Sequence, residues 1–166
     1  MTYNRQPILC LEESRTALGE IIDETRAKMP FGIDAWVLMP DHLHCIWTLP
    51  AGDSDYSKRW GLIKATYTKR VGKTLAGDGQ EESASRLKHR ERVVWQRRFW
   101  EHRIRGEKDY EMHCDYIHYN PVKHGFVSAP KDWAYSTFKR YVERGVYSEN
   151  WGSLGTVEFP KGTGAE

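Results

Sequence analysis

The chain has 166 residues, a length typical of one domain, and its 39% hydrophobic and 29% charged residues favour a packed core over disorder. The longest apolar run, around residues 35–39, is far shorter than the roughly 20 residues that span a bilayer. The first residues lack the basic and then apolar order of a signal peptide, and the three cysteines form no CxxC pair. We therefore expect a soluble cytoplasmic protein, and not a membrane, secreted or zinc-finger protein.

Positive charge is concentrated in the middle of the chain. Residues 56–108 carry 15 basic and 6 acidic side chains, whereas residues 1–55 carry 4 and 9, and residues 109–166 carry 6 and 8. The basic part includes the sequence RLKHRERVVWQRRFWEHRIR, in which Arg is interleaved with Trp and Phe. Such a segment suits a polyanion such as nucleic acid, and a solvated basic face is the alternative.

In chain order, the apolar spacing predicts a helix, two strands and a basic helix, over residues 11–29, 33–39, 43–49 and 56–70. The short link between the two strands indicates an antiparallel hairpin. Residues 72–92 have no period and many Gly, Ser and charged residues, which predicts a flexible insertion.

A second set of elements is predicted after this insertion. Residues 93–105 are expected to form a strand or an extended segment, and Gly106 opens a helix that ends near Asn120, because the residue before Pro121 disfavours helix. A short helix follows over about 135–144. Alternating helices and strands of this kind predict an α+β fold, an antiparallel RRM-like or ferredoxin-like sheet with helices packed on it.

Two histidines near the second strand form the first candidate site. The sequence Asp41-His42-Leu43-His44 places two imidazoles at positions i and i+2, which point to one face of a strand. Two such imidazoles can be two ligands of one metal ion. A pair of ordinary core or surface histidines is the alternative.

Tyr116 and Asn120 form the second candidate site. They are four residues apart on the predicted helix and therefore share a face. A tyrosine hydroxyl can be a covalent nucleophile, and an Asn carbonyl oxygen can be the ligand of a hard cation. Simple aromatic packing of this tyrosine is the alternative that the residues alone leave open.

A cluster of Arg and aromatic residues forms the third candidate site. Guanidinium groups bind phosphates, and exposed aromatic rings stack on bases. A basic edge strand protected from aggregation by its charges is the alternative. The candidate DNA contacts are Trp95, Arg97, Arg98, Phe99, Trp100, Arg103 and Arg105.

Three stretches together, MPDHLHCIWTLP, WQRRFWEHRIR and DYIHYNPVKHGFV, resemble the HUH single-tyrosine transposases, and most closely the REP-associated tyrosine transposases of bacteria. The likeness covers roughly residues 5–150 and keeps the order of the family's motifs. It implies an RRM-like sheet whose central strand carries the histidines, within a catalytic domain over 1–150 that is followed by a polar tail over 151–166. The resemblance also implies a first strand before the segment that matches residues 1–10, and this sequence begins too late to contain that strand in full.

The resemblance further implies the chemistry. His42, His44 and Asn120 would bind Mg²⁺ or Mn²⁺, and Tyr116 would attack a phosphodiester to form a 5′-phosphotyrosine. The implied partner is single-stranded or hairpin DNA with palindromic repeats, processed by a monomer. One alternative is a domesticated DNA-binding module of the same fold that does not cut. Another is an RRM-like RNA-binding protein, which would carry a Gly-aromatic signature that is not seen in the sequence.

Overall fold

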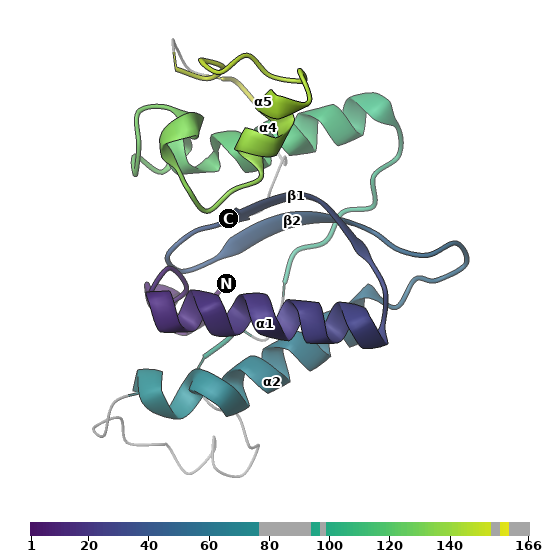
Figure 1. Cartoon of the computed structure of the whole chain (residues 1–166), viewed down its shortest axis with the longest axis vertical. Coiled ribbons are helices and arrows are strands. Elements are labelled where there is room, and N and C mark those ends of the chain that lie inside the picture. The colour runs from purple at the N-terminus through teal and green to yellow at the C-terminus, as the bar shows by residue number, and fades with distance from the viewer. Residues whose placement is uncertain (77–93, 97–98, 154–156, 160–166) are drawn as a thin grey trace. The chain divides into compact units, whose positions relative to one another are not determined.

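A computed structural model describes residues 1–76, 94–96, 99–153 and 157–159, drawn in colour in Figure 1. The chain forms two compact units. Unit 1 comprises Met1–Gly32, Pro40–His42 and Leu49–Arg97, and unit 2 comprises Ile33–Met39, Leu43–Thr48 and Arg98–Glu166. No helix among the described residues is long and apolar enough to cross a membrane.

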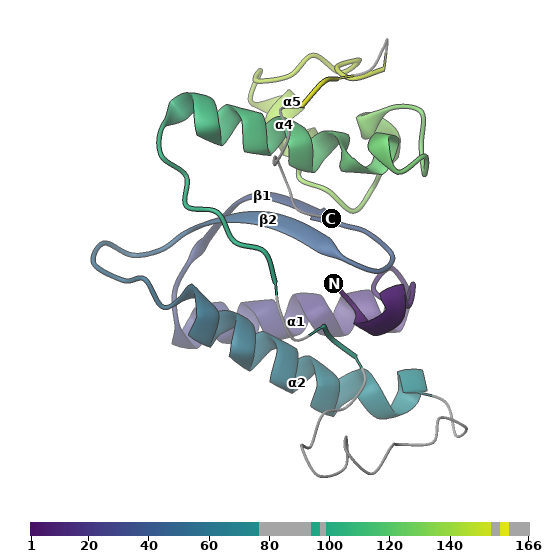
Figure 2. The ribbon, with the colours of Figure 1, turned by 180° about the vertical axis from the view of Figure 1, so that it is seen from behind.

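Unit 1 is built on two long helices, α1 (Glu12–Lys28) and α2 (Tyr56–Ala76), which lie side by side in both views (Figures 1 and 2). A short 3-10 helix, η1 (Tyr3–Arg5), precedes them. Acidic side chains begin α1 and basic side chains end it, as the helix dipole favours. The buried apolar side chains of the unit include Leu18, Ile21, Ile22, Ile63, Tyr67 and Val71. Their spacing along each helix is the pattern from which both helices were predicted.

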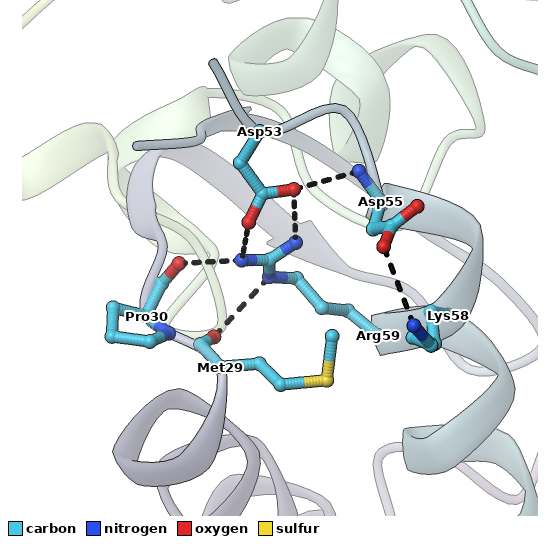
Figure 3. A network of polar contacts seen from close by, with 6 residues as sticks. All are labelled: Met29, Pro30, Asp53, Asp55, Lys58 and Arg59. Atoms are coloured by element: carbon cyan, nitrogen blue, oxygen red, sulfur yellow. Dashed lines mark hydrogen bonds and ion pairs between the residues drawn. The ribbon is translucent and has the colours of Figure 1, made fainter. Parts of the chain in front are cut away.

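A buried arginine connects the start of α2 to the end of α1 (Figure 3). The side chain of Arg59 is 1% exposed and forms a two-pronged ion pair with Asp53, with N–O distances of 3.1 and 2.6 Å. The same guanidinium donates to the backbone carbonyls of Met29 and Pro30 at 3.2 and 2.9 Å. The hydrogen bond from Arg59 lowers the pKa of Asp53 to about 2. Four acceptor atoms therefore bind this one side chain, and one of them, Asp53 Oδ1, also accepts from the backbone N–H of Asp55 at 2.8 Å.

Replacing this arginine is expected to destabilise the protein. Arg59→Met removes the guanidinium that pairs with the Asp53 carboxylate and donates to two backbone carbonyls, which should cost about 3 kcal/mol of unfolding free energy. Urea unfolding measures the change. The matched control is Lys58→Met, because Lys58 is 71% exposed and pairs with exposed Asp55. Its cost should stay below about 0.5 kcal/mol. Equal losses in the two variants would contradict the assigned role of Arg59.

Unit 2 is a two-stranded antiparallel hairpin covered by helices (Figures 1 and 2). Its elements are β1 (Gly32–Leu38), β2 (Leu43–Thr48), α4 (Glu107–Lys123), η2 (Pro130–Asp132) and α5 (Phe138–Glu143). The core of the unit joins β1 to α4 and α5, through Ala35, Val37, Met39, Cys114, Ile117, Phe138, Tyr141 and Tyr147. Helix α4 also contacts β2, so the helix with the candidate tyrosine packs on the strand with the candidate His44.

The strand β1 has backbone partners on both sides. It pairs with β2 on one side, and Val37 forms an isolated bridge with Ser136 on the other. Among the described residues, the sheet consists of the antiparallel pair β1–β2. A further isolated bridge joins Thr2 to Trp95 in unit 1.

The α+β class and the hairpin predicted from the sequence are confirmed, and two boundaries were wrong. Helix α2 continues to Ala76, so the predicted insertion begins at least five residues too early; residues 77–92 lie outside the described part. Helix α4 continues through Pro121 to Lys123, because this fully buried proline removes only one hydrogen bond near the helix end. In the described part of 93–105, the only strand-like pairing is the bridge at Trp95.

Candidate functional site

Tyr116 lies at the interface of α4 and β2 in unit 2. Its side chain is almost fully buried, with 3% of its surface exposed. The ring of His44, on β2, meets the Tyr116 ring edge to face at a centroid distance of 5.4 Å. Phe159, near the end of the chain, meets it at the same distance and angle from another direction. Helix α4, which carries Tyr116, therefore packs on the strand that carries His44 within this unit.

Two polar residues follow Tyr116 along α4. Asn120 lies one turn later and is fully buried, so its amide needs polar partners within the protein. Lys123 lies two turns later, and its ammonium donates a hydrogen bond to the Tyr116 hydroxyl at 3.0 Å. The same nitrogen lies 4.7 Å from the centroid of the Tyr116 ring. A phenol, a buried amide and a cation thus share one side of α4.

His42 lies in unit 1, just before β2 begins at Leu43. Its side chain is buried, and its Nδ1 contacts Asp41 Oδ1 at 2.6 Å. Asp41 in turn pairs with Arg5 at 3.3 Å. A carboxylate that accepts from Nδ1 holds the imidazole in the tautomer whose Nε2 carries the lone pair, the form that ligates metals. The residue therefore has the partner expected of a metal-binding histidine.

His118, a buried histidine on α4, has a structural role. His118 is fully buried, and its Nε2 and Nδ1 contact Thr137 Oγ1 at 2.8 Å and Tyr147 Oη at 3.2 Å. The Tyr147 hydroxyl donates to Asp115 at 2.7 Å, so it accepts from His118. Burial lowers the pKa of His118 to about 3. The network connects α4 to the segments around α5 while this imidazole stays neutral.

The lowered pKa predicts acid sensitivity. Between about pH 6.5 and about pH 3, His118 is protonated in the unfolded chain and neutral in the folded protein. The folded protein therefore loses stability as the pH falls through this range. The unfolding free energy should drop by about 1.4 kcal/mol per pH unit in that window. Urea unfolding at pH 7.5 and 5.5 measures this drop, and His118→Gln should reduce it. An unchanged pH slope in the variant would assign the acid sensitivity to other groups.

A second cluster lies at the start of α4, in unit 2. Asp109 accepts hydrogen bonds from His102 Nε2 at 2.8 Å and from the backbone N–H of Arg105 at 2.8 Å, and His113 Nδ1 lies 3.1 Å from it. The His102 hydrogen bond is the main cause that lowers the pKa of Asp109. The two imidazoles are stacked at 4.4 Å and 8°, and the Trp100 ring is nearly parallel to both.

This cluster has ligand atoms that could bind a metal ion and an exposed aromatic side chain. Its nitrogen and carboxylate atoms lie within 4.8 Å of one another, close enough to hold one ion. The two rings are parallel, however, and one ion cannot lie in the planes of both unless a ring turns. Trp100 is 43% exposed, so part of this aromatic side chain is accessible to a ligand.

The structure places the remaining predicted DNA contacts in different surroundings. Trp95 is partly buried in unit 1 and packs on Tyr67 at 5.0 Å. Arg103 and Arg105 are exposed in unit 2, close in sequence to Trp100. Arg97 and Arg98 lie outside the described residues.

Sequence reasoning missed Lys123 and the pair of histidines joined by Asp109. Lys123 was placed beyond the expected helix end at Asn120, although its seven-residue spacing from Tyr116 puts the two on one side of a longer helix. The spacing of Asp109 and His113, four residues apart, could have indicated a shared face in the same way.

Comparison with known proteins agrees with this arrangement. The sequence profile of the family "Transposase IS200 like" matches residues 1–120. A REP-associated tyrosine transposase of Escherichia coli K12 is 47% identical over 134 residues, which cover 81% of this chain and 70% of that protein. A Haemophilus influenzae protein, provisionally given the same name, is 40% identical over 152 residues, 87% of this chain and 84% of that protein.

A solved structure is also similar. It is the structure of a REP-associated tyrosine transposase bound to a REP hairpin, and it is 41% identical, with a TM-score of 0.77 over 98% of this chain and 84% of that one. The chain therefore belongs to the IS200-like transposase family, and it is a transposase-type enzyme. The recognition and the enzyme class predicted from the sequence motifs are confirmed.

Proposed function

We propose that this protein cuts single-stranded or hairpin DNA with Tyr116 as nucleophile. The observation that carries the proposal is the contact between Tyr116 and His44 within unit 2, with Asn120 one turn further along α4. This arrangement brings a hydroxyl nucleophile next to two side chains that can bind a cation. The names of the relatives support the same reaction, since each is a tyrosine transposase.

The proposed reaction is a transesterification. The Tyr116 oxygen attacks the phosphorus, and the bond from phosphorus to the 3′-oxygen breaks. The products are a 5′-phosphotyrosine and a free 3′-hydroxyl. One phosphodiester replaces another, so a different 3′-hydroxyl can reverse the step and join a new end without ATP.

A divalent metal is the proposed cofactor, with His42, His44 and Asn120 as its ligands. The donor set of two imidazole nitrogens and one amide oxygen suits Mn²⁺ or Mg²⁺, and the contact of Asp41 with His42 Nδ1 fits a ligating histidine. When bound, such an ion polarises a phosphoryl oxygen and stabilises its developing charge. The side chains themselves supply the orientation, because Asn120 is held by complete burial and His44 by its contact with Tyr116.

The proposed substrate is a hairpin formed by a palindromic repeat, acted on by a monomer. The REP hairpin in the similar solved structure supports this choice. The basic and aromatic composition of residues 56–108 supports contacts with phosphates and with unpaired bases. Trp100, Arg103 and Arg105 are the proposed contacts in unit 2, and Trp95 is the proposed contact in unit 1. Arg97 and Arg98 remain proposed from the sequence.

The exposed ring of Trp100 gives a separate prediction. Stacking of one base on an aromatic side chain contributes about 1–3 kcal/mol, so Trp100→Leu should weaken binding of a hairpin with a single-stranded extension about tenfold. Binding of a blunt hairpin should change little. Fluorescence anisotropy measures both affinities. Phe126→Leu is the matched control, because Phe126 is also exposed in unit 2, at 49%; an equal effect of the two variants would remove the specific role of Trp100.

The proposed function is tested with an end-labelled DNA hairpin on a denaturing gel. The wild-type protein with Mn²⁺ or Mg²⁺ should give a slowly migrating covalent adduct and a shorter fragment with a 3′-hydroxyl. The same sequence as RNA should give neither product. Tight binding of the DNA without an adduct or a fragment would replace the proposed enzyme by the alternative, a DNA-binding module that does not cut.

A further inference from the structure

Lys123 contacts the atom that the proposed reaction makes nucleophilic. Its ammonium donates a hydrogen bond to the Tyr116 oxygen at 3.0 Å, and its nitrogen lies 4.7 Å from the centre of the same ring. Tyr116 is 3% exposed, whereas Lys123 is exposed, so a lysine at the surface reaches the oxygen of a buried phenol. A positive charge is thus held against the phenol oxygen.

The local backbone explains why this lysine reaches the tyrosine. Seven residues are almost two full turns of an α-helix, so Tyr116 and Lys123 lie on one side of α4. Long side chains on a helix point back towards its N-terminus, which directs Lys123 towards Tyr116. The continuation of α4 through Pro121 keeps Lys123 in this register, with Asn120 between the two on the same side.

We infer that Lys123 is a catalytic residue that stabilises the negative charge on the Tyr116 oxygen when it attacks DNA and when it departs. The inference rests on the proposed role of Tyr116 as the nucleophile. A charged donor held at the position where negative charge develops is one of the strongest means of lowering a barrier, because it need not reorganise during the reaction. Lysine is suited to this role as a compact point charge with rotatable donors.

The step balances without any further reactant. The phenol proton passes to water, and the resulting phenolate is held by the Lys123 ammonium. The phenolate electron pair forms the bond to phosphorus, the pair of the broken bond leaves on the 3′-oxygen, and that oxygen takes a proton from water. In the reverse direction Lys123 stabilises the phenolate as the leaving group, so the same contact serves strand transfer.

The test compares single-turnover rates of adduct formation at saturating hairpin DNA. Lys123→Met keeps the length of the side chain and removes its charge, and should slow the reaction about 100-fold. The DNA affinity should stay within about twofold, because the lysine acts on the nucleophile. Lys123→Arg keeps the charge and should retain more of the rate.

The control is Lys139→Met, which removes one exposed positive charge from α5 and should react at the wild-type rate. A wild-type rate in Lys123→Met would overturn the inference while leaving the proposed function intact. An equal loss in Lys123→Met and Lys123→Arg would also overturn it, because that result indicates a structural role. Failure of the wild-type protein itself to form an adduct would remove both the inference and the function on which it rests.

Discussion

Tyr116→Phe should abolish DNA cleavage and the covalent adduct, a loss of at least about 10,000-fold given the share of rate that a covalent nucleophile supplies. The change removes one oxygen and keeps the ring that contacts His44 and Phe159, so the fold should persist. Hairpin binding should also persist, because the hydroxyl acts in the chemical step. A denaturing gel measures the adduct, and anisotropy measures the binding.

Two other tyrosines on α4 provide matched controls. The Tyr110 hydroxyl is hydrogen-bonded to Tyr141 at 2.8 Å, and Tyr119 packs against Trp151 and Phe159. Tyr110 lies on another side of α4 from Tyr116, because each residue turns the helix by about 100°. Tyr119 is a neighbour of Tyr116 on the helix and also contacts Phe159, but it is not the residue one turn before Asn120. Tyr110→Phe and Tyr119→Phe should therefore keep most of the activity. An adduct that Tyr116→Phe still forms and Tyr119→Phe does not would assign the nucleophile to Tyr119 in place of Tyr116.

Removal of the divalent metal should have the next largest effect. EDTA should abolish cleavage, and added Mn²⁺ or Mg²⁺ should restore it, because several kcal/mol of charge stabilisation at the phosphate depends on the ion. His44→Ala should slow adduct formation more than about 100-fold at fixed metal concentration for the same reason. Cleavage rates across a metal titration measure both effects.

The second cluster supplies the control for this prediction. His102, Asp109 and His113 have ligand atoms within 4.8 Å of one another, so they are the competing location for the ion. His102→Asn should leave the metal dependence of cleavage unchanged if the ion acts at His42, His44 and Asn120. A metal dependence lost in His102→Asn and kept in His44→Ala would place the functional ion at the start of α4.

The sequence predicted the elements of this fold better than it predicted their ends. The apolar spacing of α1 and the hairpin β1–β2 located both within one or two residues, because their burial follows regular patterns. The end of α4 could not be found in that way. A proline is a local signal against helix, whereas the complete burial of Pro121 is a tertiary effect that local rules do not contain.

The candidate site also has features that the sequence predicted and features that it did not. The spacing of Tyr116 and Asn120 on one helix was enough to predict a shared side. Which strand that helix contacts could not be derived from the spacing. The contact of Lys123 with Tyr116 was not predicted, because it depends on two more residues of helix beyond Pro121. The stacking of His102 on His113 depends on how the segment before α4 folds back, which no local pattern determines.

The central claim is that the Tyr116 oxygen becomes covalently bound to DNA. Mass spectrometry of the protease-digested adduct, formed with a hairpin and Mn²⁺, tests this claim most directly. We expect a nucleotide attached by a 5′-phosphate to the peptide that contains Tyr116, with fragment ions that place the added mass on that residue. The same mass on Tyr119, Tyr110 or any other residue would contradict the account.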